Sequence, residues 1–122
     1  DFLVQRVAVC QEAGISLRQL LIDPGFGFGK NFEHNRRLLA ELKNLSDLGL
    51  PLVVGLSRKG FVATLLKDSK CDRSIGSAGL AMLAAEKGAN VVRVHDVAVT
   101  RDLIRTLEQL QVVSDYRPGV FE

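Results

Sequence analysis

Three short stretches of this chain carry the residues that could do chemistry. Residues 23–30 read Asp-Pro-Gly-Phe-Gly-Phe-Gly-Lys, residues 57–60 read Ser-Arg-Lys-Gly, and residues 93–96 read Arg-Val-His-Asp. Each stretch lies at or just past the end of an apolar run that predicts a buried strand. Because ligands bind where strands end in α/β folds, we expect these polar side chains to converge on one mouth.

The third stretch predicts an anion site. Arg93 and His95 lie two residues apart in a predicted strand, so both side chains point to the same side. A buried parallel strand is normally apolar throughout, and a buried arginine is costly unless an anion meets it. We therefore interpret Arg93 as an anion-binding residue in preference to a solvated residue at an edge.

The first stretch predicts a loop that lies close to a ligand. Pro24 ends the preceding strand, and the three alternating glycines that follow allow positive φ angles or a close approach of backbone. The loop is not a P-loop, because Pro24 and Asn31 stand where that motif needs Gly and Ser or Thr. It also lacks the G-x-G-x-x-G spacing of dinucleotide sites. A plain Asp-Pro-Gly turn is the alternative interpretation.

Strands and helices are expected to alternate around these stretches. We predict strands at 20–22, 52–56 and 91–96, and helices at 1–14, 32–45, 61–66, 74–87 and 100–110. Thr100 is expected to cap the last helix. Strand followed by helix occurs three times at a step of roughly 35 residues, close to the βα unit of an α/β barrel. A small doubly wound domain is the alternative on length alone.

Composition excludes several classes of partner. The 122 residues are enough for one domain, with 47% hydrophobic and 25% charged residues. The net charge of +2 is too small to indicate nucleic acid or an anionic membrane. No apolar run of about 18–20 residues or signal-peptide pattern is present, so we expect no membrane segment. Cys10 and Cys71 fit no metal spacing, and a cytoplasmic location is expected.

Taken in order, the three stretches resemble the last three strand-end motifs of the dihydropteroate synthase family. The likeness extends from about residue 2 to residue 110. It implies the C-terminal portion of a TIM (β/α)8 barrel with parallel strands, incomplete in this chain. Residues 1–110 would belong to this pterin-binding domain and residues 111–122 would form a tail. Members of this family are transferases of folate biosynthesis and targets of sulfonamides.

The resemblance also implies the reaction and the pterin site. Family members join 6-hydroxymethyl-7,8-dihydropterin pyrophosphate to p-aminobenzoate, giving 7,8-dihydropteroate and pyrophosphate. By resemblance, Asp23 accepts hydrogen bonds from the amino and ring N–H groups of the pterin. Phe28 and Gly55 line the pterin slot, and Lys59 donates to the pterin carbonyl and a ring nitrogen.

The remaining implied roles concern the leaving group and the second substrate. Arg93 lies against the pterin and, with His95, holds the pyrophosphate as it leaves. Ser57 and Arg58 border the p-aminobenzoate site. The resemblance therefore marks Lys59, Arg93 and His95 as catalytic, with no covalent nucleophile.

The resemblance further implies partners outside these residues. Mg²⁺ is expected, with its ligand in the N-terminal part of the family's barrel, so no metal ligand is expected in this chain. A homodimer through the C-terminal helices 74–87 and 100–110 is expected. Three strands would leave two open edges, so we expect a fragment that is inactive alone and self-associates. The alternatives are a pterin-binding barrel of the methyltransferase type and a non-catalytic dimerisation fragment.

Overall fold

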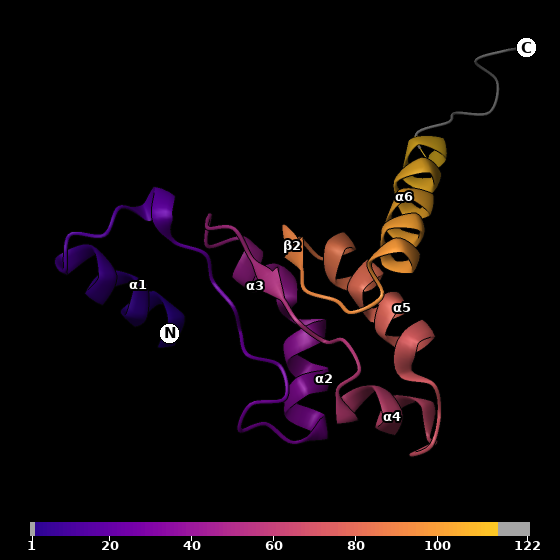
Figure 1. Ribbon diagram of the computed structural model, residues 1–122. Coiled ribbons are helices and arrows are strands. Elements are labelled where there is room, and N and C mark those ends of the chain that lie inside the picture. Colours follow the sequence, from indigo (N-terminus) through magenta and orange to yellow (C-terminus); the bar gives the residue numbers. More distant parts are fainter. Residues whose placement is uncertain (1, 115–122) are drawn as a thin grey trace, which may run out of the picture.

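The computed structural model describes residues 2–114, with side chains as far as residue 110. Along these residues the elements are α1 (Phe2–Glu12), η1 (Leu17–Gln19), α2 (Phe32–Ala40), α3 (Leu42–Ser46), β1 (Val53–Val54), α4 (Gly60–Leu66), α5 (Arg73–Glu86), β2 (Val91–Val92) and α6 (Val97–Ser114). In Figure 1, α1 lies to one side, joined to α2 by a long extended segment, and α6 rises on the other side. Within the described residues, no helix is long and apolar enough to cross a membrane.

The sheet is parallel, as the sequence predicts, but its strands are shorter. β1 and β2 pair in the register Val53↔Val91. On the other side of β1, Ile22 forms an isolated parallel bridge with Leu52. The predicted strand 20–22 is therefore a single bridge. Ile22 exchanges backbone hydrogen bonds with the β1 segment, but two residues later Pro24 has no N–H to continue a ladder.

The predicted strands 52–56 and 91–96 also end early. The backbone N–H of Arg93 still donates to the carbonyl of Val54 at 2.9 Å, which extends the pairing slightly beyond β2. Beyond that point the chain turns at Ser57 and Arg58, and the backbone pairing between the β1 and β2 segments ends. Polar residues therefore follow immediately after a very short parallel core.

Two helix predictions are wrong in detail. The predicted helix 32–45 is two helices, because Glu41 adopts φ −92° and ψ 9° between α2 and α3. Thr100 does not cap α6, which already begins at Val97. Instead its hydroxyl donates to the carbonyl of Asp96 at 2.8 Å, one helical turn earlier. The helix therefore starts directly after the third polar stretch.

Apolar residues of the segments around Ile22 and β1 and of helices α2 to α5 form one core. The fully or nearly buried members are Ile22, Phe26, Leu39, Leu42, Leu52, Val54, Leu56, Phe61 and Ala84. A glycine of α5 allows α4 to pack closely: a Cβ built on Gly76 would lie 2.8 Å from a methyl carbon of Val62 in α4. At the two sides of the sheet, Leu21 is 61% and Val91 46% exposed. Within the described residues, both edges of the sheet are therefore open.

Candidate functional site

The loop after Ile22 owes its shape to its glycines. We call residues 25–30 the glycine loop. Gly25, Gly27 and Gly29 have φ angles of +71°, +81° and +60°, which side chains adopt only with strain. The carboxylate of Asp23 accepts the N–H of Gly25 at 2.8 Å, and Lys30 Nζ donates to the carbonyl of the same glycine at 3.0 Å. The loop is thereby closed on itself.

A buried asparagine in α2 holds this loop from behind. Asn35 is 4% exposed, and its Oδ1 accepts the N–H of Gly27 at 2.9 Å. Its Nδ2 donates to the carbonyl of Asn31 at 2.9 Å and lies 3.4 Å from that of Lys30. Sequence reasoning missed this residue. The available signal was an amide three residues after Phe32, on the side of α2 that faces the core.

The two phenylalanines of the loop point in different directions. Phe26 is buried in the core, whereas Phe28 is 70% exposed. Lys59 lies between them: its Nζ donates to the carbonyl of Phe26 and sits 4.8 Å from the ring centroid of Phe28. An added Cβ on Gly27 would come within 3.3 Å of Lys59 Cδ. The Lys59 side chain therefore packs against the backbone of the glycine loop.

Lys59 has an unusual electrostatic environment. Partial burial lowers the pKa of its ammonium group, and the charge of Arg93 lowers this pKa further. The carboxylate of Asp23 acts in the opposite sense. The pKa of Lys59 therefore depends on charged side chains from the other two strand ends.

Ser57 and His95 form a direct cross-link between the second and third stretches. Ser57 Oγ lies 2.8 Å from His95 Nδ1 and accepts the backbone N–H of His95 at 3.2 Å. Ser57 Oγ can donate its proton to Nδ1 or accept a proton from it; in the first case His95 carries its ring proton on Nε2, from where it could donate to a ligand.

These side chains line a cavity of about 300 Å³. Its lining residues are Gly55, Ser57, Lys59, Arg93, Val94 and His95. The guanidinium of Arg93 lies against Gly55, where an added Cβ would be only 2.9 Å from Nη2. Two cations and an imidazole on one concave surface suit an anion.

The premise of a buried Arg93 is wrong for this chain. Both Arg93 and His95 are exposed, because β2 is the edge of the described sheet. The case for an anion therefore rests on the shared cavity and no longer on burial. A second cavity, of about 430 Å³, lies on the other side of Lys59 between the glycine loop and α4. Phe28 and Phe61 contribute aromatic walls to it.

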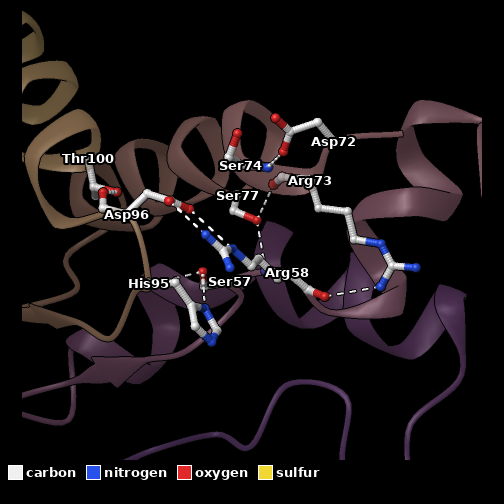
Figure 2. Close-up of polar contacts among 9 residues, drawn as sticks. All are labelled: Ser57, Arg58, Asp72, Arg73, Ser74, Ser77, His95, Asp96 and Thr100. Atoms are coloured by element: carbon white, nitrogen blue, oxygen red, sulfur yellow. Dashed lines mark hydrogen bonds and ion pairs between the residues drawn. The ribbon is translucent and has the colours of Figure 1, made fainter. Parts of the chain in front are cut away.

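Two predicted site residues, Asp23 and Arg58, line neither cavity. We call residues 57–59 the arginine loop. The guanidinium of Arg58 binds the carboxylate of Asp96, with Nη2–Oδ1 at 2.8 Å and Nε–Oδ2 at 3.3 Å (Figure 2). This hydrogen bond raises the pKa of Arg58. Arg58 does not line the cavity that its neighbours Ser57 and Lys59 share.

Metal-binding side chains are not clustered in the part of the chain that the structure describes. Within it, no three histidine, cysteine, aspartate or glutamate side chains come close enough to hold an ion together.

Comparison with known proteins shows which family this chain belongs to. The sequence profile of the family described as "Pterin binding enzyme" matches residues 1–95. The chain belongs to the pterin binding enzyme family. The dihydropteroate synthase of Escherichia coli strain K12 is 45% identical over 107 residues, which cover 88% of this chain and 38% of that protein. The predicted resemblance to dihydropteroate synthase is therefore confirmed.

Solved structures of this family support the fold. The Xanthomonas albilineans dihydropteroate synthase in complex with 7,8-dihydropteroate matches with a TM-score of 0.88 and 46% identity, covering 92% of this chain and 43% of that one. The same enzyme with 4-aminobenzoic acid matches equally well, covering 41% of that chain. The predicted fold class, a portion of an α/β barrel with parallel strands, is confirmed. The chain spans about two fifths of the length of these relatives.

The predicted domain boundary is not tested by these matches. α6 continues to Ser114, so its backbone passes the predicted limit at residue 110. The rest of the predicted tail, residues 115–122, lies outside the described residues.

Proposed function

We propose that this pterin binding chain supplies the pterin and pyrophosphate contacts of a dihydropteroate synthase. The observation that carries the proposal is the cavity in which Lys59, Arg93 and His95 meet beside the glycine loop. The 45% identity to the Escherichia coli enzyme supports the choice of reaction over a methyltransferase-type barrel. The reaction joins a dihydropterin pyrophosphate to p-aminobenzoate and releases pyrophosphate.

Asp23 and Lys59 are the proposed recognition pair for the pterin. A carboxylate matches the adjacent amino and ring N–H donors of a pterin edge, and an ammonium group matches its carbonyl. In the folded chain the charge of Arg93 lowers the pKa of Lys59 and that of Asp23 raises it, with burial as the largest cause of the net lowering. Gly55 and Phe28 would border the flat ring.

Arg93 and His95 are proposed to bind the leaving pyrophosphate. When the bond between the pterin methylene and the pyrophosphate breaks, its electron pair leaves on oxygen and negative charge grows there. Arginine can form a bidentate contact with a phosphate, and the Nε2–H of His95 adds a directed donor. Ser57 fixes the imidazole through its 2.8 Å contact with Nδ1. The amine of p-aminobenzoate then bonds to the methylene and loses its proton.

The cavity between Phe28, Phe61 and Lys59 is the proposed approach for p-aminobenzoate. It adjoins the pyrophosphate cavity through Lys59, so the amine would meet the methylene at that lysine. The Xanthomonas albilineans relative has been solved with 4-aminobenzoic acid, which supports an aromatic acid as second substrate. Ser57, which the resemblance implies as a bordering residue of this substrate, lines the pyrophosphate cavity instead.

Other expectations stay proposals for this chain. A Mg²⁺ ligand in the N-terminal part of the family's barrel remains a prediction, and no step is assigned to the ion. A homodimer through α5 and α6, and a cytoplasmic location, remain predictions. The isolated chain should show no turnover, and turnover by a purified monomer would contradict this part of the account.

Calorimetric titration tests the proposed half-site. The chain is titrated with a dihydropterin pyrophosphate analogue whose bridging oxygen is replaced by methylene. We expect binding that Asp23→Asn abolishes and that Arg93→Gln weakens about tenfold or more through lost charge-assisted hydrogen bonds. Asp47→Asn, at an exposed ion pair of α3, is the matched control. Equal binding by Asp23→Asn, or no binding by a folded chain, would overturn the assignment.

A further inference from the structure

Two cross-links join the arginine loop to the segment after β2. Ser57 contacts His95, and the next residue of each segment makes the second contact, Arg58 with Asp96. The first pair faces the cavity, and we call it the inner cross-link. The second pair lies on the other side of the same backbone, towards α6, and we call it the outer cross-link (Figure 2).

Arg58 adopts a conformation that its own side chain does not favour. Its φ angle is +56°, in the left-handed region that non-glycine residues rarely enter. Such a conformation persists only where surrounding contacts determine it, and it is concentrated at functional sites. The turn allows Ser57 and Lys59, on either side of Arg58, to line one cavity while Arg58 points away from it.

Three groups hold Arg58 in this conformation. Its backbone N–H donates to Ser77 Oγ at 2.8 Å, and Ser77 is only 3% exposed. Its carbonyl accepts Arg73 Nη1 at 3.1 Å. Its guanidinium binds Asp96, whose own carbonyl accepts the hydroxyl of Thr100 at 2.8 Å. Donor, acceptor and side chain of one residue are thereby tied to α5 and α6.

This arrangement leaves Arg58 poorly placed to bind substrate directly. A guanidinium paired through two nitrogens with a carboxylate has already met its best partner, and an approaching anion would have to displace Asp96. The resemblance implies that Arg58 borders p-aminobenzoate. The contacts indicate a different role.

We propose that the outer cross-link Arg58–Asp96 is a positioning device for the pyrophosphate site. It acts through the inner cross-link and through Lys59, and Arg58 itself does not contact substrate. The inference rests on the proposed function, because the ligand whose contacts it orders is the pyrophosphate assigned there. A shift of about 1 Å at a positioned group can cost on the order of a hundredfold in rate, so an indirect residue can matter.

The test compares single and paired variants of the full chain. Arg58→Gln and Asp96→Asn each remove one end of the outer cross-link, and a double charge swap, Arg58→Asp with Asp96→Arg, restores it in reverse. Aspartate tolerates the left-handed region better than most residues, which makes the swap feasible. Arg101→Gln, which breaks an exposed ion pair with Asp102 on α6, is the matched control.

Three readouts are measured on each variant. Inorganic pyrophosphate is titrated by calorimetry, the imidazole nitrogens of His95 are observed by ¹⁵N NMR, and amide hydrogen exchange is followed at Arg58 and Lys59. We expect each single variant to weaken pyrophosphate binding about tenfold, as loss of a supporting contact commonly does at metal sites. Combining Arg58→Gln with Asp96→Asn should add nothing, and the charge swap should recover most of the loss.

The outcomes separate positioning from direct contact. If Arg58→Gln weakens pyrophosphate binding and Asp96→Asn does not, Arg58 contacts the ligand and the proposal is wrong. If neither changes binding, His95 signals or exchange, the pair is only a surface ion pair and the proposal is also wrong. If the unsubstituted chain binds no pyrophosphate, the proposed function fails. The His95 tautomer and the exchange rates then still decide whether the outer cross-link positions the loop.

Discussion

The glycine loop and the arginine loop lie at the same end of the sheet, but they are held in different ways. The glycine loop uses three glycines with positive φ angles, and one buried amide, Asn35, fixes its backbone. The arginine loop has a non-glycine residue at a positive φ angle, and contacts from α5 and from Asp96, just before α6, fix it. One loop is shaped mainly by its own backbone and the other mainly by its neighbours.

This difference matches what each loop presents to a ligand. The glycine loop packs against Lys59. Its glycines carry no side chains, so they leave space for that lysine and for a ring. The arginine loop must direct Ser57 and Lys59 into one cavity, for which it needs contacts on its outer side. Substitutions behind each loop should therefore have distinct effects.

The largest effect on stability is expected from Asn35→Ala. The substitution removes the acceptor of the Gly27 N–H and one of the two donors to the carbonyl of Asn31, whose other donor is the backbone N–H of residue 35. A hydrogen bond of this kind contributes about 0.5–1.5 kcal/mol, so losing the three made by the buried Asn35 amide should lower the free energy of unfolding by about 2–3 kcal/mol. Urea denaturation measures it, with the exposed Asn44→Ala as control. A loss equal to that of the control would show that the glycines alone hold the loop.

A smaller loss is expected from Ser77→Ala on the other loop. The hydroxyl of this buried serine accepts the N–H of Arg58 and donates to the carbonyl of Arg73. Removing one acceptor from a buried donor should lower the free energy of unfolding by about 1–2 kcal/mol. Thr106→Ala, whose exposed hydroxyl also bonds a helix carbonyl, is the control. Stability unchanged from wild type would contradict the view that α5 fixes the arginine loop.

Arg58→Gly separates the shape of the arginine loop from its position. Glycine accepts a φ angle of +56° without strain but cannot bind Asp96. We expect the urea midpoint to change little while pyrophosphate affinity falls as it does in Asp96→Asn. Unchanged affinity in Arg58→Gly would mean that the turn alone suffices, as it does in the glycine loop.

The smallest effect is a dependence on pH that arises from Lys59. Burial lowers the pKa of this ammonium group in the folded chain below its ordinary value of 10.5. The unfolded chain therefore binds more protons between the folded pKa and 10.5, and stability should rise with pH across that window. Lys59→Met should remove this rise, which urea denaturation at a series of alkaline pH values detects. An unchanged rise in the variant would assign it to other groups.

Much of the arrangement followed from the sequence because local patterns determine it. Positive φ angles were expected in the run 25–29, where only glycine fits without strain, and they are observed. Parallel pairing of the three apolar runs also followed, because each lies before a helix. The motifs around Ser57 and Arg93 indicated a shared mouth, and the side chains of both line one cavity.

Other features depend on contacts between distant segments, which periodicity does not encode. Asn35 resembles an ordinary polar helix residue until the glycine loop folds over it. The partner of Arg58 is 38 residues away, and the motif alone gave no reason to prefer Asp96 over a substrate. The early start of α6 displaced Thr100 from the predicted cap into the first turn of the helix. Such outcomes are decided by tertiary packing.

The most direct test of the central claim is turnover by a chimera. This chain replaces the matching segment of the Escherichia coli dihydropteroate synthase, to which it is 45% identical over 107 residues. Thermal unfolding first establishes that the chimera is folded. The account predicts formation of 7,8-dihydropteroate from dihydropterin pyrophosphate and p-aminobenzoate, lost in Asp23→Asn and in Arg93→Gln. A folded chimera without turnover, or one whose turnover survives both substitutions, would contradict it.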